Sequence, residues 1–229
     1  MPDLVPVHLW NPSSIKRSLV GQVTTSPSTI SGIVQAVKTD GGGLWRVDYS
    51  GISLRGPRAL ESWNAWTAHL AGGATLVNAP MAEIAMAPYR NKPTRVRAPD
   101  TDPDPNFPSQ GPYGANRAII ATVTAAALRA TTVTVTVTHG APLRSGQGFG
   151  VIHASGTHRW YRIVRVQSRN GMAATVTIEP PLREAVTAGT PVDFEWGSFL
   201  ARMIPDSDPY PEISVRHSTV SISFIEAFR

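Results

Sequence analysis

The chain has 229 residues, of which 41% are hydrophobic and only 16% are charged, and its formal net charge is +5. With 20 prolines, 19 glycines and no cysteine, the composition suits short strands joined by many turns and excludes disulfides and thiolate metal sites. The basic residues are dispersed and no run of about 18 apolar residues occurs, so neither a basic nucleic-acid-binding tail nor a membrane span is indicated. We expect a soluble product that is made in the cytoplasm.

Strand-like sequence dominates residues 15–54. The runs SLVGQVT, SGIVQAVKTD and LWRVDYSGISL combine β-branched and aromatic residues with partial alternation of apolar and polar positions. Between the last two runs, the stretch from Asp40 to Gly43 predicts a hairpin turn, because glycine reaches the positive φ that tight turns need. We therefore predict an antiparallel sheet in this part of the chain.

The segment GPRALESWNAWTAHLAGG predicts the main helix. Pro57 suits its first turn, and Gly72 and Gly73 follow its end. Helical spacing favours packing of one face against the sheet over a ligand platform, and four apolar residues share that face: Ala59, Trp63, Trp66 and Leu70.

Residues 88–113 are dense in proline and change from basic to acidic along their length. Proline excludes a helix or a central strand here, so we predict an extended arm or linker that separates two domains. Its charged residues are our candidate interface residues: Arg90, Arg95, Arg97, Asp102 and Asp104.

Residues 114–196 read as successive short strands and predict a small β barrel. In the run TTVTVTVTHG, valines at 133, 135 and 137 share one side and threonines the other. A bare strand of this kind would pair with other chains, so it is either closed within a barrel or covered by another subunit.

The C-terminal run also alternates, with Val220, Ile222 and Phe224 on one side and polar residues on the other. This strand has a face to bury and needs a sheet to join, for which we predict the N-terminal one. The barrel would then be an insertion.

No catalytic residue, metal site or cofactor is predicted, and we expect no enzymatic activity. The six histidines show no metal-ligand spacing, and the acidic run at 100–104 fails as a calcium loop because Pro105 follows it where glycine is required. No GxSxG motif occurs. The GxGxG spacing of Gly146, Gly148 and Gly150 lacks a following helix, which favours a bulge or hairpin over a phosphate cradle.

Aromatic residues in the barrel segment are candidates for ligand contact. Trp160, Tyr161 and Trp196 could present faces to a sugar. Because Arg159 and Arg162 flank the first two, single-stranded nucleic acid is another candidate ligand. Alternation sends Trp160 and Tyr161 to opposite faces of their strand.

The order of these elements resembles a known family. The phrases that carry the resemblance are the hairpin GGGLWRVDYSGISL, the helix ALESWNAWTAHLAGG, the run VTIEPPLREAV and the ending VSISFIEAF. Over most of its length, the chain resembles the distal tail protein and other minor tail proteins of long-tailed (siphovirus-like) phages and gene transfer agents.

This resemblance implies a mainly β fold with one packed helix. A tail-tube-like β-sandwich or split barrel would comprise residues 1–112 and 197–229, with an OB-like or galectin-like β barrel inserted at 114–196. It further implies a structural protein of the virion tail tip, a hexameric ring that joins the tail tube to the baseplate hub proteins. DNA would pass through the ring without specific binding, and no membrane partner is expected. The alternative is a carbohydrate- or host-surface-binding β module without catalytic activity.

Overall fold

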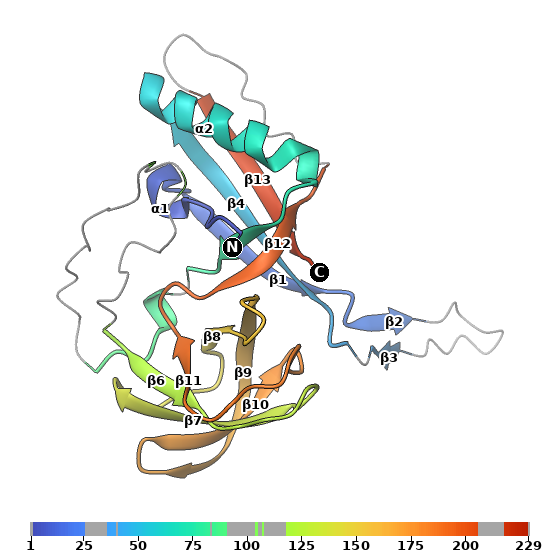
Figure 1. Ribbon diagram of the computed structural model, residues 1–229, viewed down its shortest axis with the longest axis vertical. Coiled ribbons are helices and arrows are strands. Elements are labelled where there is room, and N and C mark those ends of the chain that lie inside the picture. Colours follow the sequence, from blue (N-terminus) through green and yellow to red (C-terminus); the bar gives the residue numbers. More distant parts are fainter. Residues whose placement is uncertain are drawn as a thin grey trace.

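The computed structural model describes residues 2–25, 36–39, 41–82, 84–90, 104, 107, 118–205 and 218–228. Within these residues the protein is mainly β, with one packed helix, a five-stranded sheet and a small closed barrel (Figure 1). The predicted fold class is therefore confirmed as a β-rich fold with a small barrel.

The five-stranded sheet draws its strands from both ends of the chain. Its antiparallel order is β1-β4-β13-β12-β5, with these bounds: β1 Ser14–Val20, β4 Leu44–Leu54, β5 Val77–Pro80, β12 Ser198–Met203 and β13 Ser218–Glu226. The alternating C-terminal run forms β13 and joins the N-terminal sheet beside β4, as predicted. Its apolar side is buried and its polar side faces outward.

The predicted helix is α2, Pro57–Leu70, continued by the short η1, Ala71–Gly73. It lies across one face of the sheet (Figure 1), and Trp63, Trp66 and Leu70 are fully buried there. A second short helix, α1 (Val7–Trp10), brings Trp10 edge-on to Trp63, with ring centroids 4.8 Å apart. Trp63 and Trp66 therefore serve the core, as their helical spacing indicates.

The barrel closes in the order β10-β7-β6-β11-β8-β9. Its strands are β6 Ile120–Val123, β7 Thr132–His139, β8 Gly148–Ile152, β9 His158–Asn170, β10 Ala173–Glu179 and β11 Thr190–Asp193; the short η2, Ile84–Met86, precedes them. The valines of β7 are buried and β7 pairs with both β6 and β10. Barrel closure thus covers this uncharged strand without help from another subunit.

Two short strands project from the body. They are β2 (Val23–Thr25) and β3 (Ala36–Lys38), which pair only with each other among the described strands; we call β2 and β3 the ribbon (Figure 1).

The predicted hairpin turn between Asp40 and Gly43 is wrong, because β3 pairs with β2 whereas β4 pairs with β1. Asp40 itself lies outside the described residues. Gly42 and Gly43 do have positive φ, 69° and 84°, but they use it to lead the chain from the ribbon into β4.

Candidate functional site

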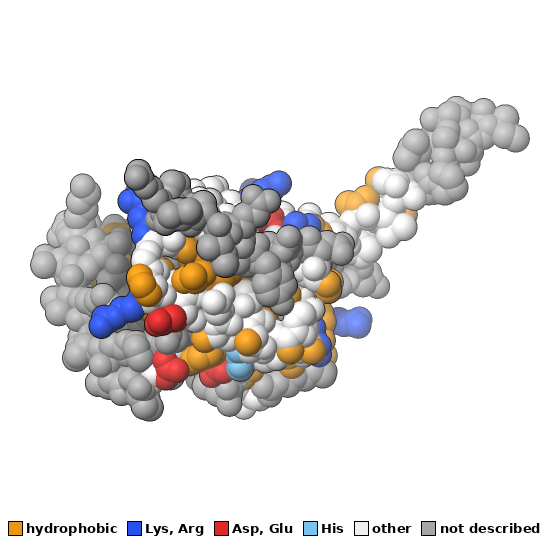
Figure 2. Space-filling view, turned by 90° about the horizontal axis from the view of Figure 1, so that it is seen from above, with side chains coloured by type: hydrophobic (Ala, Val, Ile, Leu, Met, Phe, Trp, Pro, Cys, Tyr) orange, Lys and Arg blue, Asp and Glu red, His pale blue; other side chains and the backbone are white. Residues whose placement is uncertain are grey.

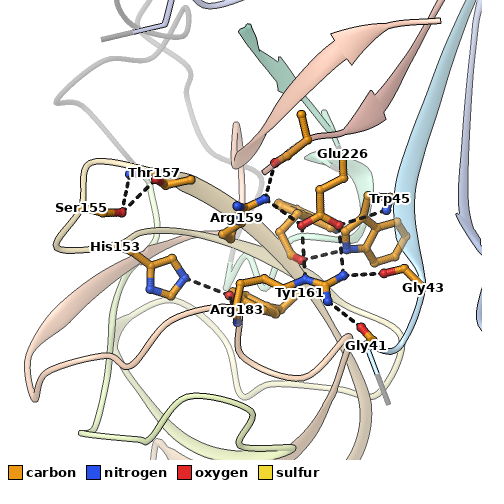
Figure 3. A network of polar contacts seen from close by, with 12 residues as sticks. Gly41, Gly43, Trp45, His153, Ser155, Thr157, Arg159, Tyr161, Arg183 and Glu226 are labelled. Carbon is orange, nitrogen blue, oxygen red and sulfur yellow. Dashed lines mark hydrogen bonds and ion pairs between the residues drawn. The ribbon is translucent and has the colours of Figure 1, made fainter. Parts of the chain in front are cut away.

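A buried carboxylate joins the barrel to the sheet. Glu226, at the end of β13, has a side chain only 1% exposed. Arg159 of β9 donates from Nη1 to Glu226 Oε1 at 3.0 Å, and Arg183 donates from Nη2 to Oε2 at 3.2 Å (Figure 3). The backbone N–H of Trp45 in β4 also donates to Oε2, at 3.2 Å. The carboxylate therefore has the charge partners and hydrogen bonds that burial of an ion requires.

The residues after Glu226 cover this cluster. Arg159 Nη1 also donates to the carbonyl oxygen of Ala227 at 2.8 Å. The ring of Phe228 lies over both guanidinium groups, with its centroid 4.4 Å from Cζ of Arg159 and 5.2 Å from Cζ of Arg183. This geometry allows a cation–π contribution to the stability of the cluster formed by Glu226, Arg159 and Arg183, which we call the junction between the barrel and the sheet.

Arg183 also reaches the base of the ribbon. Its Nη1 donates to the carbonyl oxygen of Gly41 at 2.5 Å, and its Nη2 donates to that of Gly43 (Figure 3). Gly42, between them, packs so closely on the loop after β10 that a Cβ would lie 2.5 Å from Cδ of Pro181. One guanidinium group thus contacts the sheet, through Glu226, and the chain that leaves the ribbon.

A second barrel residue, Glu179, also contacts the base of the ribbon. Its Oε1 accepts hydrogen bonds from Nε2 of Gln22 at 2.6 Å and from Nζ of Lys38 at 3.0 Å. Gln22 directly precedes β2 and Lys38 ends β3. A single carboxylate oxygen therefore contacts the residue that precedes β2 and the last residue of β3, at the base of the ribbon.

A polar chain continues from Arg183 into the barrel. The backbone N–H of Arg183 donates to Oη of Tyr161 at 3.0 Å, and this oxygen lies 2.8 Å from Nε2 of His153 (Figure 3). Burial lowers the pKa of His153 and raises that of Tyr161, because each charged form would lose hydration. At neutral pH the tyrosine is therefore protonated and the imidazole is neutral, and the two groups share one hydrogen bond.

The structure corrects the prediction that Trp160 and Tyr161 face a ligand. Alternation does send them to opposite faces of β9, but both faces are covered: Trp160, 1% exposed, packs in the sheet core, and Tyr161, 0% exposed, packs in the barrel core. Trp196 is half-buried, with its ring edge-on to that of His8 at 6.3 Å between centroids. Neither Trp160 nor Tyr161 offers a face to a sugar or a base.

One glycine of the GxGxG run, Gly150, serves close packing. Gly148 and Gly150 lie in β8, and a Cβ on Gly150 would lie 2.5 Å from Cα of Gly197. A Cβ on Gly197 would in turn meet the Trp160 ring at 2.4 Å. These two glycines let the barrel wall approach the chain that enters β12.

The candidate interface residues of the Pro-rich segment are only partly described. Arg90 and Asp104 are exposed, whereas Arg95, Arg97 and Asp102 lie outside the described residues. Their role at an interface stays a prediction. No sequence pattern singles out Phe107, whose ring stacks on that of Trp66 with centroids 5.0 Å apart.

Among the described residues, no three or more His, Cys, Asp or Glu side chains gather as a metal site. Nor does any helix in the described parts of the chain have the length and apolar character needed to cross a membrane.

Sequence reasoning missed Glu226, Arg183 and Glu179. Glu226 carried a usable signal, since it falls on the same side of the alternating C-terminal run as Ile222 and Phe224. A carboxylate on a buried face requires a cationic partner. The sequence could not name that partner, because Arg159 and Arg183 are 67 and 43 residues away along the chain.

No protein-family model matches the chain, and no curated protein matches it.

Proposed function

We propose that this chain is a structural subunit of a phage-like tail: a distal tail protein that forms a hexameric ring and joins the tail tube to the baseplate around the DNA channel. The proposal combines the family resemblance of the sequence with one structural observation, the projecting ribbon.

All six residues of β2 and β3 are exposed, including Val23 at 52% and Val37 at 64%. Figure 2 shows hydrophobic side chains on the surface of the projecting ribbon. A two-stranded ribbon of this length has little stability of its own in water, because neither face is buried. Exposed valines and unpaired strand edges are the features that dock on another β protein. The ribbon therefore supports a role in assembly.

The two edge strands of the five-stranded sheet are β5 and β1. β5 is covered by the N-terminal segment: Val5 N–H donates to Asn78 O at 3.0 Å, and Asn78 N–H donates to Asp3 O at 2.8 Å. Among the described strands, β1 pairs with β4 alone. The side of β1 that pairs with no other described strand and the ribbon are different surfaces, and contacts between different surfaces of identical subunits generate closed rings when the rotation allows.

The runner-up function, carbohydrate or host-surface binding without catalysis, loses part of its basis. It relied on Trp160, Tyr161 and Trp196, of which the first two are buried. Aromatic faces must be accessible to stack on a sugar.

Native mass over a range of protein and salt concentrations, with negative-stain images of any large species, tests the proposal. We expect a ring of six subunits with a central channel at high protein concentration. A strict monomer under all conditions, including with a tail-tube partner supplied to nucleate the ring, would count against it. A glycan screen on the full chain would then be the next experiment.

A further inference from the structure

The base of the ribbon contacts the barrel. β2 and β3 are three residues each and make no strand pairing with the sheet or the barrel. A ribbon of this kind, left to itself, would swing about its base. Its base, however, is held by side chains that come from the loop and strand end at residues 179–183.

The contacts reach both sides of the ribbon base. Glu179 binds Gln22 before β2 and Lys38 at the end of β3, at 2.6 and 3.0 Å. Arg183 binds the carbonyl oxygens of Gly41 and Gly43, on the chain between β3 and β4. Contacts to the chain that enters the ribbon and to the chain that leaves it resist rotation as well as translation, whereas contact with only one of these would leave a hinge.

Arg183 is itself fixed by the sheet. Its Nε and Nη2 donate to the two oxygens of Glu226 at 3.3 and 3.2 Å, and its side chain is only 10% exposed. A planar guanidinium group with several engaged donors has little rotational freedom. The ribbon base, the sheet and the barrel therefore meet at one rigid group.

We propose that Glu179 and Arg183 are positioning residues that set the direction of the ribbon, so that the barrel determines where the ribbon meets a neighbouring copy of this chain. The neighbour rests on the proposed function, but the direction is a property of the single chain. In this proposal the barrel contributes to assembly by orienting the ribbon.

The test measures the ribbon direction in the full-length monomer. The chain has no cysteine, so spin labels at Thr24→Cys on β2 and Ala68→Cys on α2, both exposed positions, report one distance by pulsed electron paramagnetic resonance. We expect a narrow distance distribution in the parent and a distribution about twofold broader, or shifted, in Glu179→Ala/Arg183→Ala, because the ribbon is not stable by itself. The matched control is Glu61→Ala/Arg202→Ala. It also removes one negative and one positive charge, but at exposed positions on α2 and β12.

Arg183→Ala also breaks the contact with Glu226 and could prevent folding, so Glu179→Ala alone is the second variant. Glu179 contacts the ribbon base without touching Glu226, and its loss should broaden the distribution while the melting temperature stays near that of the parent. A purely structural role would lower the melting temperature and leave the distribution unchanged. Unchanged distributions in both variants would overturn the inference.

Native mass of the same proteins separates this inference from the proposed function. Broadened distributions with a parent that never assembles would support the positioning role and reject the ring. Unchanged distributions with a parent that forms rings would reject the positioning role and retain the ring.

Discussion

At the scale of single residues, Glu226 faces two guanidinium groups in a site from which water is excluded. Glu226→Ala would leave Arg159 and Arg183 without their anion, so we expect the free energy of unfolding to fall by about 3–5 kcal/mol. Glu226→Gln keeps an acceptor oxygen and should cost less. Urea denaturation measures both losses.

The exposed Glu61→Ala provides the control for removing a carboxylate. A loss for Glu226→Ala no larger than the roughly 0–1 kcal/mol typical of exposed ion pairs would contradict the role given to the junction.

His153 should make stability depend on pH. Its pKa is lowered in the folded protein, mainly by burial, with an opposing effect of Glu184, so below its ordinary value of about 6.5 the unfolded chain binds a proton that the folded chain does not. Stability is therefore full above pH 6.5 and falls as the pH drops below it towards the folded pKa.

The melting temperature measured from pH 8 to 5 checks this expectation. His153→Gln should flatten the decline, whereas Gln at the exposed His139 should leave it unchanged. Equal slopes for the parent and His153→Gln would exclude His153 as the cause.

At the residue scale, the alternation along a strand predicted to which face a side chain points, but not what that side chain packs against. The alternation of β9 correctly placed Trp160 and Tyr161 on opposite faces. It could not reveal that each face meets a hydrophobic core, because the second core is formed by strands far away in the sequence. The sequence-based expectation of exposed aromatics failed for that reason.

At the scale of elements, long periodic segments were predictable and short ones were not. The helix at Pro57–Leu70 and the strands β7 and β13 carry their own apolar periods. The four-residue β11 contains Pro191 and has no such period. Glycines 41–43 indicated a bend, but a bend does not specify which strands pair, and the chain there runs from the ribbon into the sheet.

The ribbon supplies the prediction that belongs to this scale. Val37→Asp places a charge on its exposed face, which would have to be desolvated in any contact with another subunit. We expect at least about a tenfold weaker assembly, equivalent to roughly 1.4 kcal/mol, with no change in monomer melting temperature. Sedimentation velocity over a concentration series measures the effect.

Leu128→Asp, at an equally exposed apolar position on the barrel, is the matched control for this experiment. If both variants weaken assembly to the same extent, general charge repulsion explains the result and the ribbon has no special part in assembly.

At the scale of the whole molecule, the sheet and the barrel share side chains. Trp160 belongs to a barrel strand but packs in the sheet core, and the indole N–H of Trp45 in β4 donates to the Trp160 carbonyl oxygen at 2.8 Å. Arg162 of β9 lies over the Trp45 ring, 4.8 Å from its centroid. Together with the Glu226 cluster, these contacts should make the two parts unfold as one cooperative unit.

Trp160→Ala tests that cooperativity. Removal of a buried tryptophan should cost about 3–5 kcal/mol, and because this side chain bridges the two parts, the single calorimetric transition of the parent should separate into two. Phe149→Ala removes an equally buried ring that packs only in the barrel core, so it should lower the melting temperature and keep one transition. Two transitions already present in the parent would mean that the barrel and the sheet fold independently, and the barrel could then not hold the ribbon rigidly with respect to the sheet.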